Sequence, residues 1–406
     1  MKKKTLQYKL IDYFRKTSAY DLTNELMQTL HLSRQKVQAR KIEKMKALFI
    51  HAYETTVYYK EVFDQCGFNP YSFSIETFEA FQKVPCLTKK IIRDRYNDLI
   101  SSKANKYIPR VMRSSGTSGN PMKYILSKNS HSYLWADAYR QWLLGGWEFG
   151  DAIGVFRGSA ITKLGEIKGQ LYRLLNNWTF FDMFQGVSEQ SMNQVIKTIE
   201  EKNLQFLYGY TAGIYKLASY LASIGKTLPL KAVFTTTEVL QPNWRKTIEE
   251  TFSTSVFDFA QVCDGGFSMF QCSEKHYHIS EDICHIEYDA NKEMQEVIVT
   301  GYFNFTMPFI KYKNGDLYIP SNTNQCLCGC NFMRIDKLAG RSFEYFNLPN
   351  NEKVHGAYFS DTFREFDMVK SFQIIQINET EILFLIHKKK ITVDYNAFQK
   401  GIHEIK

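Results

Sequence analysis

The sequence predicts a mixed α/β protein with a helical N-terminal part and a short α+β part at its C-terminal end. Residues 1 to about 105 are expected to be mainly helical, and Lys36–Tyr59 carries apolar side chains at helical spacing with basic residues between them. From about residue 122, short apolar runs alternate with amphipathic stretches, which is typical of parallel strands joined by helices. No run approaches the roughly 20 apolar residues of a membrane span, so we expect no transmembrane segment.

The N-terminal part is expected to hold three helices. They are a long one over Lys36–Tyr59, one opened by Ser74–Phe78, and one over Ile91–Leu99 after a turn at 85–90. The α/β part follows, and its expected elements are strands 152–156 and 232–236, helices Ser188–Glu201 and Thr211–Ile224, a β-rich continuation with Val297–Thr300 and Phe309–Tyr312, and a final strand Ile382–Ile386.

Composition narrows the class of protein. The chain has 406 residues, 44% of them hydrophobic and 23% charged, with a net charge of +9. The charge is spread out and forms no basic stripe interleaved with aromatic residues, so we expect anionic small ligands and no nucleic acid. The start of the chain is basic but lacks the apolar segment of a signal peptide, which predicts a cytoplasmic protein. A homodimer stays open.

One segment is rich in hydroxyl groups and glycine. Its residues are Ser114, Ser115, Gly116, Thr117, Ser118 and Gly119. Glycines let the backbone approach a ligand, and exposed hydroxyl and amide groups can donate to a polyanion such as a triphosphate. The segment is not a Walker A loop, because no Gly-Lys-Ser/Thr closes it. On these residues alone, a polar hairpin turn remains the alternative.

The run from Ser114 to Pro121 resembles the phosphate-binding signature of the adenylate-forming enzymes, the acyl-CoA synthetase superfamily. It is most similar to the phenylacetate-CoA ligase branch, which includes the CapK-like proteins of capsule biosynthesis. Further partial matches lie in the family's order within residues 85–345, one before this run and the others after it. They are Leu87–Lys90, Leu207–Thr211, Thr235–Leu240, Val256–Gly266, Pro308–Leu317 and Gly340–Glu344.

The resemblance implies roles for single residues. Ser114–Gly119 would bind phosphates, Glu238 would line the nucleotide and acyl pockets, and Asp264 would bind the Mg²⁺ of ATP. Asp316 would accept hydrogen bonds from both ribose hydroxyls, because a carboxylate offers two acceptor oxygens, and Arg341 would contact ribose and phosphate. Asn314-Gly315 alone would also suit a hairpin turn.

The sequence departs from the family's pattern at several places. Two threonines precede Glu238 where glycines are usual, and Ala260 and Gln261 replace the tyrosine and glycine of the adenine-stacking segment. Phe259 is the candidate substitute for the stacking ring. The 65 residues after Arg341 contain no Gly-Lys loop of the kind that carries the adenylation lysine. Either the chain is truncated or adenylation is impaired, and no catalytic residue is assigned.

The resemblance also implies an organisation and an activity. Residues 1–340 would form a large adenylation domain and residues 341–406 a shortened C-terminal domain. The expected enzyme is an acid–thiol ligase that uses ATP, Mg²⁺ and CoA to activate a carboxylic acid as acyl-adenylate. Two alternatives stay open: a capsule or cell-wall biosynthesis relative that transfers an acyl group to a sugar or carrier, and a catalytically impaired binding paralogue. The acid itself is not identified.

The eight cysteines point to a metal site. Without a secretion signal, metal binding is favoured over a disulfide framework. Thiolate and imidazole are the preferred ligands of Zn²⁺, and four of them close a structural site. We expect Cys272, His278, Cys326 and Cys328 to bind Zn²⁺, and the phenylacetate-CoA ligase branch has a similar Cys…His…Cys-x-Cys-Gly pattern. His276 and Cys330 are the alternate ligands, and buried free thiols are the alternative interpretation.

Overall fold

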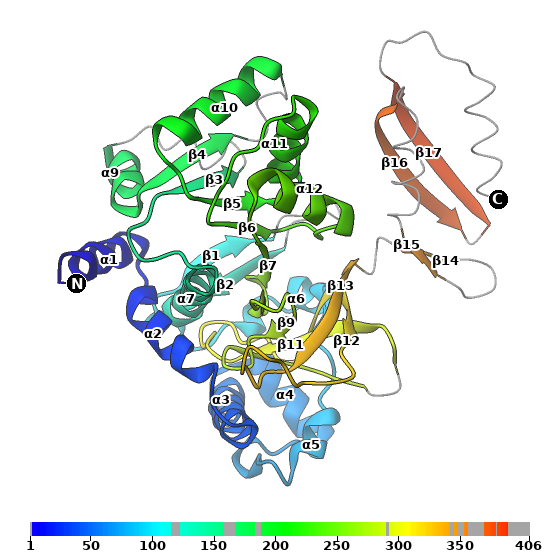
Figure 1. Ribbon diagram of the computed structural model, residues 1–406. Helices are drawn as coiled ribbons and strands as arrows, with labels where there is room; N and C mark the ends of the chain where they lie inside the picture. The colour runs from blue at the N-terminus through cyan, green and yellow to red at the C-terminus, as the bar shows by residue number, and fades with distance from the viewer. Residues whose placement is uncertain are drawn as a thin grey trace. The chain divides into compact units, whose positions relative to one another are not determined.

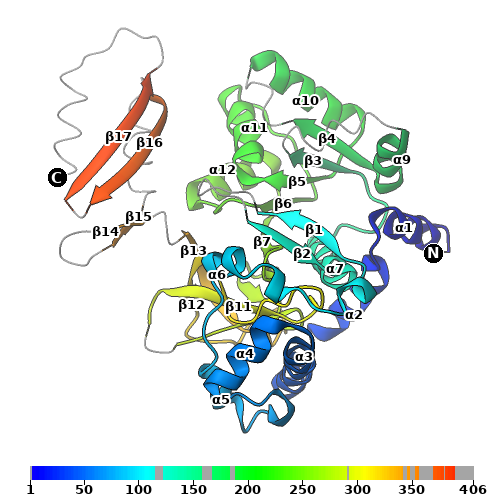
Figure 2. The same ribbon diagram turned by 180° about the vertical axis from the view of Figure 1, so that it is seen from behind.

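The structure is a computed structural model, shown from two sides in Figures 1 and 2. It describes residues 2–114, 122–157, 167–182, 188–289, 292–341, 345–347, 353–355, 369–378 and 380–388. The chain divides into two compact units. The first comprises Met1–Asn314 and Tyr318–Ala339, and the second comprises Gly315–Leu317 and Gly340–Lys406. Whether these units correspond to the two expected functional domains stays a prediction.

The N-terminal part is helical, as the sequence predicts. Its helices are α1 (Lys2–Arg15), α2 (Ala19–Thr29), α3 (Arg34–Thr55), α4 (Val57–Cys66), α5 (Phe78–Gln82) and α6 (Lys89–Asp94), with 3₁₀ turns at Pro70–Ser72, Asn97–Leu99 and Ala104–Tyr107. None of the helices in the described ranges combines the length and apolar composition needed to cross a bilayer.

Two helix predictions need correction. The helix expected over Lys36–Tyr59 is broken at Thr56, whose backbone is extended (φ −123°, ψ 142°). The Thr56 hydroxyl accepts from the backbone N–H of Tyr59 at 3.2 Å, so it caps α4 rather than continuing α3. The helix expected over Ile91–Leu99 is likewise divided into α6 and the 3₁₀ turn at Asn97–Leu99.

A hairpin and an alternating α/β part follow. The elements are β1 (Arg110–Arg113), β2 (Lys123–Leu126), α7 (Lys128–Leu144), β3 (Ile153–Arg157), α9 (Ile167–Asn176), β4 (Trp178–Asp182), α10 (Glu189–Glu201), β5 (Phe206–Tyr210), α11 (Thr211–Ser223), β6 (Ala232–Thr236), α12 (Pro242–Phe252) and β7 (Val256–Val262). Strands β4, β3, β5, β6 and β7 pair in that order, all parallel. The predicted parallel sheet is confirmed.

Alternate residues of the parallel strands face different helices. Phe206 and Phe234 pack with α1, α2 and α7, in a cluster that includes Tyr8. Their neighbours Leu207 and Val233 pack with α10, α11 and α12. Because successive side chains of a strand point to opposite faces, the sheet is covered by helices on both sides. This layering explains why these strands read as nearly continuous apolar runs.

The rest of the large sheet consists of six further strands, several of which pair in antiparallel fashion. They are β8 (Phe267–Gln271), β9 (Tyr277–Ile279), β10 (Cys284–Ile286), β11 (Gln295–Gly301), β12 (Tyr312–Pro320) and β13 (Arg334–Arg341). Within the described ranges the sheet has eleven strands, in the order β10-β11-β12-β13-β9-β8-β7-β6-β5-β3-β4.

The β-rich continuation differs from the prediction in two details. Of the strand expected over Phe309–Tyr312, only Tyr312 belongs to a strand, since β12 begins there. Asn314 and Gly315 lie inside β12 and form no hairpin. Gly315 has a φ of +93°, which glycine adopts at little cost. The glycine therefore provides a left-handed backbone conformation inside β12 and does not form a turn between two strands.

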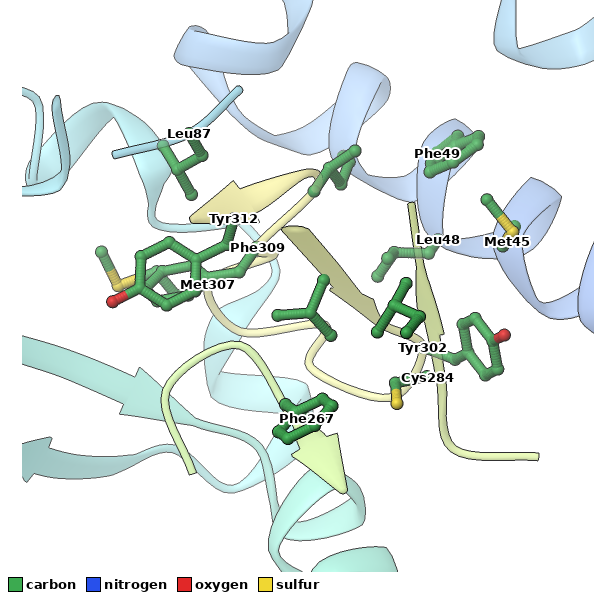
Figure 3. Close-up of a cluster of buried hydrophobic side chains, with 14 of the residues drawn as sticks. Met45, Leu48, Phe49, Leu87, Phe267, Cys284, Tyr302, Met307, Phe309 and Tyr312 are labelled. Atoms are coloured by element: carbon green, nitrogen blue, oxygen red, sulfur yellow. The ribbon is translucent and has the colours of Figure 1, made fainter. Parts of the chain in front are cut away.

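The largest apolar cluster joins the N-terminal helices to the antiparallel strands. Figure 3 shows Leu48 and Phe49 of α3 with Phe267 of β8 and with Tyr302 and Tyr312. All five side chains are buried. At roughly 1.5–3 kcal/mol for each large buried apolar side chain, this contact is a main source of stability for the first unit. It fixes the N-terminal helices against the sheet.

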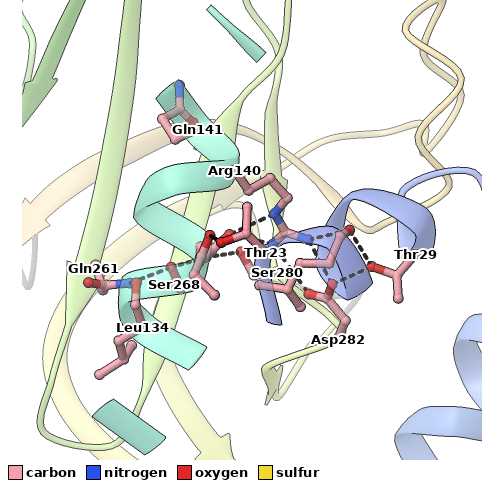
Figure 4. A network of polar contacts seen from close by, with 12 residues as sticks. Thr23, Thr29, Leu134, Arg140, Gln141, Gln261, Ser268, Ser280 and Asp282 are labelled. Atoms are coloured by element: carbon pink, nitrogen blue, oxygen red, sulfur yellow. Dashed lines mark hydrogen bonds and ion pairs between the residues drawn. The ribbon is translucent and has the colours of Figure 1, made fainter. Parts of the chain in front are cut away.

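A buried ionic network fastens α7 to the strands beside it (Figure 4). The side chain of Arg140 is fully buried, and its Nη1 lies 2.7 Å from Oδ2 of Asp282. Its Nε donates to Oδ1 of Asp137 at 2.7 Å. Burial disfavours the charged guanidinium, but the two carboxylates outweigh that effect and raise the pKa of Arg140.

The second unit contributes short antiparallel pairs. They are β14 (Tyr345–Asn347) with β15 (Lys353–His355), and β16 (Val369–Asn378) with β17 (Glu381–Lys388). The strand expected over Ile382–Ile386 lies within β17. Within residues 341–406 the described residues form strands, apart from the turn at Thr380, and the helix expected in this α+β part is not among the described residues.

Candidate active site and metal cluster

The first candidate site lies where the parallel strands end. Strands β5, β6 and β7 run side by side in the same direction, so their carboxyl ends meet at one edge of the sheet. Glu238 follows β6, and Asp264 follows β7. The carboxyl edge is where open α/β sheets bind ligands. The structure therefore places these two predicted residues on the expected side of the sheet.

The turn from β5 into α11 depends on a glycine. Gly209 has a φ of +148°, and a Cβ at this position would lie 2.0 Å from the backbone oxygen of Phe156 in the neighbouring strand. No other residue fits there. The hydroxyl of Thr211 donates to the backbone oxygen of Glu238 at 3.2 Å. The first turn of α11 is therefore joined to the end of β6.

Glu238 acts at the start of that helix. Its Oε2 accepts from the backbone N–H of Ala212 at 2.7 Å, which satisfies one of the free amide groups of the first turn. A carboxylate at this position also interacts favourably with the helix dipole. Glu238 is exposed. Its observed contact is thus with the helix N-terminus, and its expected role in lining a ligand pocket stays a prediction.

Asp264 is a buried carboxylate with one identified partner. It is 9% exposed, and the hydroxyl of Tyr312 donates to its Oδ2 at 2.9 Å. The adjacent Gly265 has a φ of +88°, and a Cβ there would lie 2.6 Å from the Tyr312 ring. The glycine thus allows Tyr312 to reach the carboxylate. Sequence reasoning missed Tyr312 in this role, because no local pattern links the two residues.

The hydroxyl-rich segment is reached by the hairpin β1–β2. At its base, the backbone N–H of Ser114 donates to the oxygen of Met122, and the Ser114 hydroxyl accepts from the N–H of Met122, both at 2.8 Å. Ser115, Gly116, Thr117, Ser118 and Gly119 lie outside the described residues. A small hollow lined by Leu126 after this segment and by Cys263 and Gly265 shows that the hairpin adjoins the end of β7.

The two remaining residues that were expected to bind the nucleotide form an ion pair with each other. The Nε of Arg341 on β13 donates to Oδ1 of Asp316 on β12 at 3.2 Å. Asp316 is buried and Arg341 is half-buried. Both belong to the second unit. The structure brings together the two residues that the resemblance assigned to ribose.

The suggested adenine-stacking substitute is wrong. Phe259 on β7 is 4% exposed and packs in an apolar cluster with Leu30, Ala138 and Phe332. Its ring is used in the interior and offers no free face to a base. The neighbouring Gln261 donates to the backbone oxygen of Leu134 at 2.9 Å. Neither residue can replace a stacking tyrosine.

The second candidate site is the cysteine–histidine cluster. One ligand atom from each of Cys272, His278, Cys326 and Cys328 lies within 4.8 Å of all the others. Cys272 follows β8 and His278 lies on β9, whereas Cys326 and Cys328 belong to the segment before β13. The four residues expected from sequence are therefore adjacent in space. Their distances test whether a metal ion would fit.

The spacing matches a tetrahedral zinc site. Ideal Zn–S and Zn–N bonds of about 2.3 and 2.05 Å at tetrahedral angles give S···S and S···N separations of about 3.8 and 3.6 Å. The Sγ atoms of Cys272 and Cys326 are 3.7 Å apart. The Sγ of Cys328 is 3.5 Å from Nε2 of His278. The donor set and its geometry therefore fit Zn²⁺.

The surroundings of the cluster keep its histidine in the form that binds metal. His278 is fully buried, and burial together with the charge of Arg334 lowers its pKa to about 4, so the ring is neutral at pH 7. Its Nδ1 lies 3.4 Å from the backbone oxygen of Phe332, the partner that orients a ligand histidine.

Of the two alternate metal ligands, His276 has a side-chain atom in contact with the cluster. Its Nδ1 is 3.3 Å from the Sγ of Cys326. Cys330 is buried, and its backbone N–H donates to the Sγ of Cys328 at 3.4 Å. Neither belongs to the mutually adjacent set of four. Their contacts are those of residues next to the ligands.

Comparisons with known proteins place the chain among relatives of low sequence identity. No family model matches the sequence. Protein CapK of Staphylococcus aureus is 22% identical over 352 residues, which cover 81% of this chain and 74% of that protein. The phenylacetate-coenzyme A ligase of Thermus thermophilus is 23% identical over 332 residues, which cover 77% of this chain and 72% of the ligase.

Solved structures show the same fold. A 2-hydroxyisobutyryl-CoA ligase in complex with R3-HIB-AMP matches with a TM-score of 0.67 at 15% identity, over 93% of this chain and 83% of the ligase. An open conformation of that ligase, in complex with 2-HIB-AMP and CoA, matches with a TM-score of 0.62. The fold is therefore that of the adenylate-forming ligases. In sequence the chain is similar to CapK and to a phenylacetate-CoA ligase, and in fold it is similar to acyl-CoA ligases.

Proposed function

We propose that this protein is an AMP-forming ligase that activates a carboxylic acid. The carboxylate would attack the α-phosphorus of ATP to give an acyl-adenylate and release pyrophosphate, and the acyl group would then pass to the thiol of CoA. The observation that carries the proposal is the buried carboxylate of Asp264 at the end of β7, beside the hairpin that leads into the hydroxyl-rich segment. Similarity to a phenylacetate-coenzyme A ligase and to a 2-hydroxyisobutyryl-CoA ligase supports the same reaction class.

The residues present fit these reactants by their chemistry. The hydroxyl and amide groups of Ser114–Gly119 would bind the phosphates, and Asp264 would bind Mg²⁺, which prefers carboxylate oxygens. Tyr312 would orient that carboxylate through its hydrogen bond. Asp316 would bind the ribose, with Arg341 beside it. Catalysis would rest on positioning and on neutralising charge, and Mg²⁺ would supply charge neutralisation at the phosphates.

ATP–pyrophosphate exchange tests the first half-reaction. The full chain is assayed with a panel of aryl and aliphatic acids. At least one acid should support exchange, and Asp264→Asn should lower the rate by about 100-fold, in the range found when one stabilising group is removed. Asp94→Asn, on the exposed part of α6, is the matched control and should leave the rate unchanged. If no acid supports exchange, the protein is a binding paralogue and the ligase proposal fails.

A second candidate concerns the acceptor. The similarity to CapK over 81% of this chain favours a role in capsule biosynthesis, in which the acyl group would go to a sugar or carrier instead of CoA. Single-turnover assays with the acyl-adenylate and each acceptor separate the two. Thioester formation with CoA supports the first proposal, whereas transfer only to a sugar or carrier supports the second. ATP and CoA use also fits the expected cytoplasmic location, and a homodimer stays a prediction.

We further propose that Cys272, His278, Cys326 and Cys328 hold a structural Zn²⁺. Four protein ligands leave no open position, which is typical of structural and not catalytic zinc. Elemental analysis of the purified protein should find about one zinc per chain. A stable protein that contains no metal after expression in zinc-supplemented medium would refute the site.

A further inference from the structure

A basic hollow of about 590 Å³ lies in the first unit, and its lining residues have no role in the proposed reaction. Its cations are Arg15 and Lys16 at the end of α1, Arg110 at the start of β1, and Lys128 at the start of α7. His131 and Trp135 on α7 also line it, together with Ser127 and Tyr172. Among the residues that the structure describes, no acidic side chain belongs to the lining. Four cations facing one hollow produce a strongly positive potential there.

These cations lack carboxylate partners. In the part of the chain that the structure describes, none of the four forms an ion pair. Arg15 is 8% exposed, and its guanidinium lies 3.7 Å from the centre of the Trp135 ring. Its hydrogen bonds go to the hydroxyls of Tyr139 and Tyr172. A buried guanidinium held only by neutral groups favours an anion nearby.

His131 supplies the more specific argument. Trp135 and Arg110 can only donate, and a neutral imidazole accepts at one nitrogen; because Trp135 Nε1 lies closer to Nε2 (3.1 Å) than Arg110 Nη1 lies to Nδ1 (3.4 Å), we assign Nε2 as the accepting nitrogen. A neutral ring then carries its proton on Nδ1. That Nδ1 faces Nη1 of Arg110 at 3.4 Å, and Nη1 is also a donor. The N–H groups of His131 Nδ1 and Arg110 Nη1 thus face each other, and no acceptor lies between these two donors.

The protonation state of His131 agrees with this geometry. Burial, followed by the charges of Arg110 and Arg15, lowers its pKa to about 4, so the ring is neutral at pH 7. Protonation would add a third unpartnered donor beside two guanidinium groups. The start of α7 adds to the same potential, because Ser127 and Lys128 line the hollow where the helix dipole is positive. An oxyanion would satisfy all of these groups.

We propose that this hollow binds the phosphate group of a phosphate ester, with its oxygens accepting from His131 Nδ1–H and from the Arg110 guanidinium. A doubly charged phosphate matches four cations better than a single carboxylate does. The exposed apolar residues Phe14 and Ile108 also line the hollow and would contact the organic part of the ligand. The proposal is independent of the ligase reaction.

The phosphate ester has two chemical sources. One is a small water-soluble molecule, and the other is the headgroup of an anionic lipid. The second is relevant because α1 also exposes Leu6 and Tyr13, which could lie on a membrane surface. The probes are therefore inorganic phosphate, adenosine 3′,5′-bisphosphate, and phosphatidylcholine vesicles with and without phosphatidic acid.

The test compares three forms of the full chain. The wild type, the double variant Arg110→Gln/Lys128→Gln, and the control Lys103→Gln/Lys106→Gln are titrated by calorimetry with the soluble probes and sedimented with the vesicles. Lys103 and Lys106 are exposed and lie outside the lining, so the control removes the same charge. The hollow variant should bind at least about tenfold more weakly, whereas the control should bind like the wild type.

Each outcome decides the proposal. Binding of a soluble probe that only the hollow variant loses supports a small ligand, and the same pattern with phosphatidic acid vesicles alone supports a lipid headgroup. In the wild type, the ¹H–¹⁵N signal of His131, assigned by its absence in His131→Asn, should shift on saturation with the bound probe. The proposal is overturned if no probe binds in the millimolar range, or if both variants lose the same affinity.

Discussion

Thr237 is held at a backbone φ of +79°, a conformation that a β-branched residue rarely adopts. It lies between the end of β6 and Glu238, at one of the positions where the family resemblance led us to expect glycine. The sequence showed the substitution, but only the structure shows that the backbone still has the conformation suited to glycine. The threonine is therefore a strained residue at the edge of the candidate active site.

Thr237→Gly should stabilise the protein. Relief of the left-handed conformation should raise the free energy of unfolding by about 1 kcal/mol, after allowance for the greater freedom of glycine in the unfolded chain. Guanidinium denaturation followed by fluorescence measures the change. Thr236→Gly is the matched control, because Thr236 is a buried strand residue without a positive φ, and it should destabilise. Equal effects of the two substitutions would contradict the strain at Thr237.

At the scale of elements, two polar arrangements connect segments that are distant in the sequence. The Arg140 network joins α7 to the segment after β9, and the cysteine–histidine cluster joins β8 and β9 to the segment before β13. The cluster could be predicted because thiol and imidazole groups at close spacing indicate metal chemistry directly. The Arg140 network could not, because isolated Asp and Arg residues in a sequence carry no information about burial or partners.

Arg140→Met should destabilise strongly. Removing the guanidinium leaves Asp137 and Asp282 buried without their cation, which typically costs about 3–5 kcal/mol. Chemical denaturation measures the loss, and Lys106→Met on the surface should change stability by no more than about 0.5 kcal/mol. Adding Asp282→Asn to Arg140→Met should recover part of the loss. A variant as stable as the wild type would show that the ion pairs make no net contribution.

Loss of one cysteine of the cluster should release the metal and loosen the strands around it. Cys326→Ser should contain clearly less than one zinc per chain and melt about 5 °C or more below the wild type, because a bound metal stabilises only the folded state. Elemental analysis and calorimetry measure the two effects. Cys66→Ser is the control, since Cys66 lies on α4 away from the four ligands, and it should keep full metal content.

At the scale of the whole molecule, most of the architecture could be predicted. Apolar runs gave the parallel strands, because both faces of that sheet are covered by helices. Asn314-Gly315 is a pattern typical of a hairpin turn, yet both residues lie inside β12, because pairing within the large sheet overrides a local turn preference. The basic hollow could not be predicted at all, since Arg15, Arg110 and His131 meet only through tertiary packing.

His131, which is half-buried, also gives the molecule an acid sensitivity. His131 has a native pKa of about 4, below the value near 6.5 of an unfolded chain, because burial and nearby cations disfavour its charged form. The unfolded state therefore binds the proton first. The stability contributed by neutral His131 is fully present above about pH 6.5 and is lost as the pH falls toward 4.

Between pH 7 and pH 5, this residue alone should lower the free energy of unfolding by about 2 kcal/mol. Denaturation at both pH values measures the loss, and His131→Gln should reduce the difference by that amount. His31→Gln, at an exposed position, should not. An unchanged pH dependence in His131→Gln would place the acid sensitivity elsewhere.

The 3.7 Å gap between the sulfurs of Cys272 and Cys326 has a practical consequence. The two atoms that a metal ion would hold apart as thiolates are also close enough for an oxidant to join them once the ion is gone. Chelators in aerobic buffer would then trap a cross-linked form that added zinc cannot reload. Preparations meant for reconstitution should therefore be kept under reducing conditions from lysis onward.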